Sequence, residues 1–110
     1  HMPAYVIFDP GPRTDPKAMK HYGAKAFPTL VPYGGKVIVR SNNLEIRESD
    51  NGPGWKPTRL PIIEFPSMAA ARGWYDSPEY QEVLPIRLAA ATENVVIVAG
   101  LERPSTPADH

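Results

Sequence analysis

The sequence contains no cysteine, which excludes a disulfide framework, a thiolate nucleophile and a thiolate metal site. It also lacks an excess of charge, because twelve basic residues are balanced by twelve acidic residues. A neutral chain has no overall field that attracts nucleic acid or an anionic membrane, so we expect neither partner. No apolar run is long enough to span a membrane and no N-terminal signal stretch is visible, which predicts a cytoplasmic protein.

The residues that are present are typical of one small globular domain. The 110 residues are 42% hydrophobic and 22% charged, close to the average for folded proteins. We expect a single domain over residues 3–100. His1 and Met2 read as an expression scar followed by a start methionine. Residues 101–110, with two prolines and few large apolar side chains, are expected to form a flexible tail.

Hydrophobic periodicity and the fourteen prolines divide this domain into alternating strands and helices. Strands are predicted over residues 4–9, 36–40, 59–65 and 94–99. Helices are predicted over residues 16–30, 67–76 and 78–91, the last kinked or broken at Pro85. Residues 44–48 suggest a short hairpin arm, and residues 49–57 an exposed loop. This order predicts an α+β, ferredoxin-like βαββαβ fold, with a four-stranded antiparallel sheet and helices on one face.

Side chains alternate along a strand, so each predicted strand presents two sets of residues. The first sets are apolar and are expected to pack under the helices: Val6, Phe8, Val37, Val39, Pro61, Ile63, Phe65, Val95, Ile97 and Ala99. The second sets are mixed: Tyr5, Ile7, Asp9, Lys36, Ile38, Arg40, Leu60, Ile62, Glu64, Asn94, Val96 and Val98. An apolar patch of this size on an open face is typical of an interface or a ligand site.

We therefore expect a homodimer in which two sheets face each other and enclose an apolar cavity with a few charged groups. Within it, Glu64 is a candidate general base, because burial would raise the pKa of its carboxyl. Arg40 is a candidate clamp for a negatively charged ligand oxygen. An ion pair between these two, or with a partner arginine, is the alternative. The charges could also lie at strand ends, in water.

His21 is a candidate proton shuttle, although the helical spacing favours a half-exposed surface position. Candidate ligand-binding residues are Asp9, Tyr5, Ile38, Ile62, Tyr75, Tyr80 and Arg87. The alternative role for Asp9 is to shape a turn. The alternative for Arg87 is an ion pair with Glu79 or Glu82. No histidine-based metal site is expected, because no histidine ligand spacing occurs, and nothing points to the all-carboxylate site that stays open as the alternative.

Several phrases resemble an uncharacterised bacterial family known as a domain of unknown function. They include the WYDSPEY stretch at residues 74–80, the IEFPS stretch at 63–67 and the YGG stretch at 33–35. The resemblance covers residues 3 to about 100. It implies membership of the dimeric α+β barrel superfamily, whose relatives include cofactor-free monooxygenases, muconolactone isomerases and small ligand-binding domains.

The resulting expectation is a protein without a cofactor that acts on a small, partly apolar ligand. As an enzyme it would carry out proton transfer, isomerisation, lactone chemistry or oxygenation, with Glu64 or His21 moving the proton and Arg40 stabilising negative charge. A proline amine at residue 3, if exposed by removal of Met2, is a further candidate base. A non-catalytic binding module and a structural dimer with a filled barrel stay open as alternatives.

Overall fold

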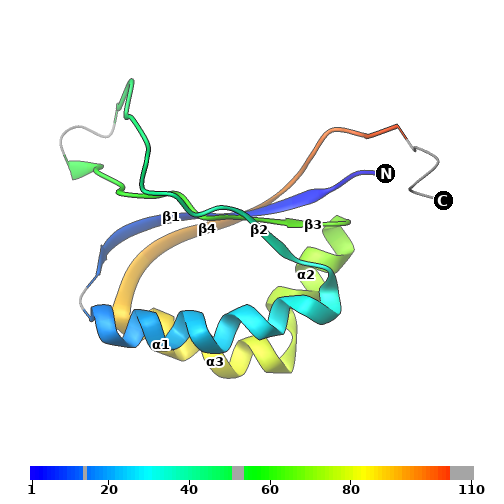
Figure 1. The fold of residues 1–110 in the computed structure, drawn as a ribbon, viewed down its shortest axis with the longest axis horizontal. Helices are drawn as coiled ribbons and strands as arrows, with labels where there is room; N and C mark the ends of the chain where they lie inside the picture. The colour runs from blue at the N-terminus through cyan, green and yellow to red at the C-terminus, as the bar shows by residue number, and fades with distance from the viewer. Residues whose placement is uncertain (14, 51–53, 105–110) are drawn as a thin grey trace.

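A computed structural model describes residues 1–13, 15–50 and 54–104 (Figure 1). The predicted loop at 49–57 and the predicted tail at 101–110 therefore lie partly outside the described residues. The elements are β1 (Ala4–Arg13), α1 (Pro16–Ala26), the 3₁₀ helix η1 (Phe27–Tyr33), β2 (Lys36–Val39), β3 (Ile62–Phe65), α2 (Met68–Asp76), α3 (Pro78–Ala90) and β4 (Ala91–Ala99). None of the described helices is long and apolar enough to cross a membrane.

The four strands form one antiparallel sheet in the order β2-β3-β1-β4, and the helices cover one of its faces (Figure 1). This arrangement confirms the predicted α+β fold with a four-stranded antiparallel sheet and helices on one face. The segment between β2 and β3 projects from the sheet on the side away from the helices.

Side-chain caps and one glycine fix where the helices begin and end. Asp15 accepts a hydrogen bond from the Ala18 amide at 3.0 Å and so caps α1, as the Asp-Pro sequence predicts. The helical path then tightens into η1 and ends at Gly34, whose φ of 70° lies in the left-handed region that favours glycine. The single helix predicted over 16–30 is thus an α-helix followed by a 3₁₀ helix.

Other expectations for the elements were also wrong. β1 continues to Arg13 instead of ending at Asp9, and β4 begins at Ala91 instead of Asn94. The predicted arm at 44–48 is not a strand, and β3 begins at Ile62 instead of Arg59. The helix α3 is not broken at Pro85, since one α-helix runs from Pro78 to Ala90 with Pro85 inside it.

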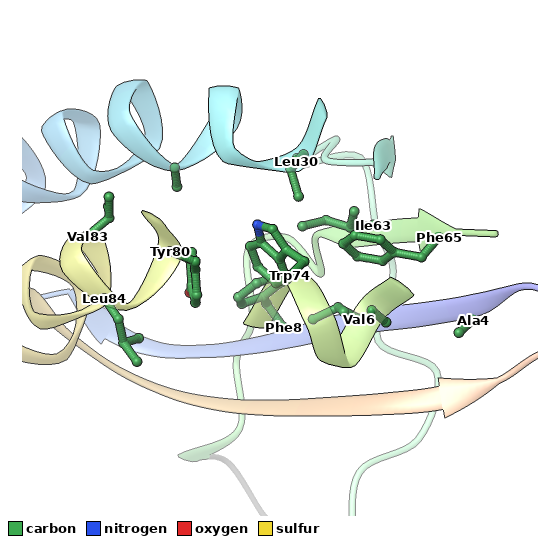
Figure 2. Packing of buried hydrophobic residues seen from close by; sticks show 12 residues of the cluster. Ala4, Val6, Phe8, Leu30, Ile63, Phe65, Trp74, Tyr80, Val83 and Leu84 are labelled. Atoms are coloured by element: carbon green, nitrogen blue, oxygen red, sulfur yellow. The ribbon is translucent and has the colours of Figure 1, made fainter. Parts of the chain in front are cut away.

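The core lies between the helices and the covered face of the sheet (Figure 2). Trp74 of α2 is its centre: its ring lies 4.1 Å from that of Tyr80 and 5.5 Å from that of Phe65, centroid to centroid. Its indole N–H donates to the Thr29 hydroxyl at 2.9 Å, so its polar atom is satisfied in the core. Val6 and Phe8 pack below from β1, as their predicted face requires.

An irregularity in β2 changes the predicted faces at the sheet edge. Val37 lies opposite Ile63, but Val39 lies opposite Ile62, so the register shifts between Val37 and Val39. An extra residue in one strand reverses the alternation beyond it. Val39 was predicted to pack under the helices, but it is 38% exposed. It pairs with Ile62, a residue predicted on the face of the sheet away from the helices, which we call the open face.

Candidate functional site

A pocket of about 190 Å³ lies between the helices and the covered face of the sheet. Its apolar wall is formed by Phe8, Met19, Ala26, Leu30, Ile63 and Trp74, and its polar groups are Tyr22, Arg40, Arg59 and Glu93. The volume is below the range of roughly 300–1,000 Å³ typical of sites for drug-sized ligands, so it suits a molecule of one or two rings. This pocket lies within one chain, on the helix side of the sheet. It is therefore a different pocket from the cavity that the sequence predicts between the sheets of two chains.

Four polar side chains gather beside this pocket. Tyr22 of α1 and Tyr80 of α3 share a hydrogen bond of 2.7 Å between their hydroxyl oxygens. Arg87 of α3 and Glu93 of β4 form an ion pair with an Nη1–Oε1 distance of 3.8 Å, and their side chains are only 3% and 6% exposed. The Arg87 guanidinium also lies 5.8 Å above the ring centroid of Phe8. Tyr22 and Glu93 contact the pocket directly, and Tyr80 and Arg87 lie behind them.

Two atoms of this cluster have unused hydrogen-bonding capacity. Arg87 Nε and Glu93 Oε1 are buried and have no hydrogen-bond partner among the described residues. Burial of an unsatisfied charged donor or acceptor is unfavourable by roughly 1–3 kcal/mol or more, and such groups are rare in folded proteins. Glu93 Oε1 meets Arg87 Nη1 at 3.8 Å, beyond hydrogen-bond distance, and the Glu93 side chain is part of the pocket lining.

Burial and mutual contacts set the ionisation of the cluster. Burial raises the pKa of the Tyr22 hydroxyl far above its usual value of 10, and the neighbouring Tyr80 and Glu93 add to the effect. Burial likewise raises the pKa of Tyr80. For Arg87, burial opposes the charge, but its interactions with Tyr80, Tyr22 and Glu93 outweigh this and raise the pKa of the guanidinium. Both tyrosines are therefore neutral hydroxyl groups, and Arg87 is a cation.

The three predicted catalytic residues do not meet in one site. Glu64 lies on the open face, where its carboxylate accepts a hydrogen bond of 2.9 Å from Arg103. Arg40 was predicted on that same face, but the register shift in β2 turns it to the helix side, where it lines the pocket. The expected Glu64–Arg40 pair is therefore replaced by a Glu64–Arg103 pair. His21 is exposed on α1 and is not part of the pocket lining. This agrees with the surface position that the helical spacing favours.

The predicted ligand-binding residues divide into two groups. Tyr80 and Arg87 belong to the buried cluster, and Tyr75 packs behind Tyr80 with ring centroids 5.4 Å apart. Arg87 pairs with Glu93, whereas the sequence-based alternative was Glu79 or Glu82.

The other predicted ligand-binding residues are not at the pocket. Tyr5 and Ile62 lie in the strands outside the lining, with Tyr5 accepting a hydrogen bond from Arg103 at 2.8 Å. Ile38 is 49% exposed at the sheet edge. Asp9 accepts hydrogen bonds from the Trp55 indole at 3.0 and 3.2 Å, so it anchors the β2–β3 segment.

Sequence reasoning missed Tyr22 and Glu93. Tyr22 was assigned only to the apolar stripe of α1, although its hydroxyl faces a buried partner. Glu93 was left outside the fourth strand, which begins at Ala91 instead of Asn94. The sequence signal that could have identified Glu93 is a carboxylate close to the apolar run of residues 95–99. Among the described residues, no group of three histidine, aspartate or glutamate side chains could hold a metal ion.

Comparison with known proteins gives a family and a set of shared folds. The family model described as "Domain of unknown function (DUF1330)" matches residues 3–101. No functionally curated protein matches the chain.

The similar solved structures include RPA0582, a protein of unknown function from Rhodopseudomonas palustris, which is 22% identical with a TM-score of 0.63 and coverage of 92% of this chain and 84% of the other. SnoaB from Streptomyces nogalater, a cofactor-independent oxygenase, is 15% identical with a TM-score of 0.56 and 96% coverage of both chains. Rv0793 from Mycobacterium tuberculosis is 16% identical, with a TM-score of 0.50 over 97% of this chain and 99% of the other.

Proposed function

The chain belongs to the DUF1330 family, and because that family is a domain of unknown function, we propose an activity from the pocket itself: the cofactor-independent removal of a proton from a small, partly apolar ligand. The observation that carries this proposal is the Glu93 carboxylate in the wall of a largely apolar pocket, where its Oε1 accepts no hydrogen bond and meets Arg87 Nη1 only at 3.8 Å. A carboxylate that accepts no hydrogen bond at one oxygen and lies in a largely apolar pocket is suited to act as a general base.

The rest of the cluster supports this role. Tyr22 lines the same pocket and its hydroxyl stays protonated; with Tyr80 as the donor in their shared bond, the Tyr22 hydroxyl can donate to the oxygen on which negative charge develops. Tyr80 and Arg87 act as positioning residues. Tyr80 holds the Tyr22 hydroxyl at 2.7 Å, and the Arg87 cation lies beside the Glu93 carboxylate at 3.8 Å.

Proton removal from an activated carbon leaves a delocalised carbanion, and its next step defines the reaction. A proton returned at a different carbon gives isomerisation, which includes the isomerisation of lactones. Reaction of a CH₂ carbanion with O₂ gives a carbonyl group and water. SnoaB, which shares the fold, is described as a cofactor-independent oxygenase, and this supports oxygenation as one outcome of such chemistry on this scaffold.

We also propose that the working unit is a homodimer formed through the open face of the sheet. Val96 and Val98 are 54% and 45% exposed on this face, and Ile38 is 49% exposed at its edge. Apolar patches of this kind are unusual on a monomer. The resemblance of the fold to dimeric α+β barrels supports the same arrangement.

The test uses 1,3-dihydroxynaphthalene, a two-ring phenol with an exchangeable ring C–H between its hydroxyl groups. The exchange of this proton in D₂O is followed by ¹H NMR, and O₂ uptake is followed with an oxygen electrode. We expect the wild-type protein to accelerate the exchange and Glu93→Gln to lower the rate by about 100-fold or more, since a positioned base contributes 10²–10⁴-fold.

The matched control is Glu82→Gln, which removes an exposed carboxylate on α3 and should leave the exchange rate unchanged. Circular dichroism of each variant establishes that the fold is retained. If the wild-type protein binds the naphthalenediol without accelerating exchange, or if Glu93→Gln exchanges at the wild-type rate, the catalytic role of Glu93 is refuted. The first of these results favours the non-catalytic binding module.

A further inference from the structure

The pocket described above opens toward a second hollow through two arginines. Arg40 and Arg59 line the apolar pocket, and both also line an adjoining hollow with Ser41, Asn42 and Thr58. The second hollow thus presents two guanidinium groups together with hydroxyl and amide groups. A ligand that fills the apolar pocket and extends past the arginines would place its far end among cationic and hydrogen-bonding groups.

The sheet order separates these arginines from Glu93. Arg40 follows β2 and Glu93 lies in β4, which form the two outer edges of the β2-β3-β1-β4 sheet. These edges are three strand spacings apart, which corresponds to about 14 Å. Arg40 and Glu93 nevertheless belong to the same end of the sheet. Glu93 pairs with Pro10 of β1. Arg40 directly follows Val39, which pairs with Ile62 of β3, and Ile62 in turn pairs with Ile7 of β1.

The pocket is therefore polarised, with a carboxylate on one side and cationic groups on the other. A ligand carboxylate near Glu93 would compete with the carboxylate that already pairs with Arg87, whereas near Arg40 and Arg59 it would meet guanidinium groups at the pocket lining. A hydroxyl group on the Glu93 side would instead meet a carboxylate that can accept its hydrogen bond. These preferences orient a ligand that carries both groups.

We propose that the ligand is an elongated aromatic hydroxy acid whose carboxylate binds at Arg40 and Arg59 and whose hydroxyl end reaches Glu93. This inference rests on the proposed function, because it places the ligand in the same pocket. It adds the substrate class and the orientation. Arg40 and Arg59 set the specificity for an acid, and the proton is removed at the other end of the molecule.

The experiment compares two fluorescent probes that differ in one group. In 6-hydroxy-2-naphthoic acid the hydroxyl and carboxylate lie at opposite ends of the ring system, and 2-naphthol lacks the carboxylate. We expect the acid to bind the wild-type protein at least 10-fold more tightly than 2-naphthol in low salt. This preference should fall in 0.5 M NaCl, since charge attraction at an exposed arginine is screened.

Substitution separates the arginines from the rest of the pocket. Arg40→Gln and Arg59→Gln should each reduce the preference for the acid several-fold and leave the affinity for 2-naphthol unchanged. Arg72→Gln is the control, because Arg72 is exposed on α2 and lines neither hollow. It should leave both affinities unchanged.

The outcomes distinguish this inference from the proposed function. Equal affinity of the wild-type protein for the two probes, or an unchanged preference in both arginine variants, overturns the hydroxy-acid inference. Either result leaves the proton-transfer proposal to its own test with the naphthalenediol. Failure of both probes to bind overturns the inference and the proposed ligand pocket together.

Discussion

The buried Tyr22 hydroxyl gives this protein a specific response to alkaline pH. Burial raises the pKa of Tyr22 in the folded state, so the folded protein holds this proton more tightly than the unfolded chain does. The resulting stability is fully present below pH 10 and is lost as the pH rises toward the folded pKa. Between pH 9 and pH 11 this single group should lower the free energy of unfolding by about 1 kcal/mol.

Tyr22→Phe removes this titration. The variant should lose less stability than the wild-type protein between pH 9 and pH 11, by about 1 kcal/mol, because phenylalanine has no proton to release. Urea unfolding at the two pH values, followed by circular dichroism, measures the difference. An equal loss in the two proteins would show that the Tyr22 hydroxyl ionises in the folded state as readily as in the unfolded chain.

At the same scale, the residues of the site were only partly predictable. Tyr80 was identified because aromatic residues with polar tips are common in binding pockets, and Arg87 because its guanidinium could anchor a ligand. Their partners could not be identified, because the Tyr22–Tyr80 bond joins residues 58 positions apart and depends on how α1 packs against α3. Glu93 was missed because the boundary of its strand was placed three residues too late.

Among the elements, the sharp junction between α2 and α3 depends on one buried serine. The Ser77 hydroxyl donates to the Trp74 carbonyl at 2.7 Å and accepts from the Tyr80 amide at 3.2 Å, and the residue is 3% exposed. It thereby ends one helix and caps the next. Both neighbours are core residues, so this turn also fixes the position of the Tyr80 hydroxyl beside the site.

Ser77→Ala should therefore destabilise the protein by about 2 kcal/mol, at the upper end for loss of a helix cap. Ser67→Ala is the matched comparison, because Ser67 caps α2 through a single bond of 3.0 Å to Ala70 at a partly buried position. Its cost should be about 1 kcal/mol. Urea unfolding of both variants tests the difference, and a smaller loss for Ser77→Ala than for Ser67→Ala would contradict it.

The elements themselves were largely predictable, and the reason for the exceptions is physical. Capping residues and strand-forming runs predict where α1, α2 and β1 begin, and their order predicts the sheet. The irregularity in β2 was invisible, because nothing in Val37, Ile38 and Val39 distinguishes a regular strand from one with an extra residue. That single shift moved Arg40 from the open face to the pocket and removed the predicted Glu64–Arg40 site.

For the whole molecule, the distribution of apolar surface predicts how copies of the chain associate. The open face carries Val96 at 54% exposure, and the opposite, helical side carries Leu88 of α3 at 63% exposure. Each is an exposed apolar side chain, but Val96 and Val98 share one face of a continuous sheet, whereas Leu88 lies on a helix. Pairing through that face would cover Val96 and leave Leu88 in water.

We expect the wild-type protein to sediment as a dimer at micromolar concentration. Val96→Glu should shift it to a monomer, since the dimer would bury two unpaired carboxylates near its centre. Leu88→Glu introduces the same charge on the helical side and should remain dimeric. Sedimentation velocity of the three proteins measures this directly. A wild-type monomer, or dissociation by Leu88→Glu instead of Val96→Glu, would rule out association through the sheet and place the working unit in a single chain.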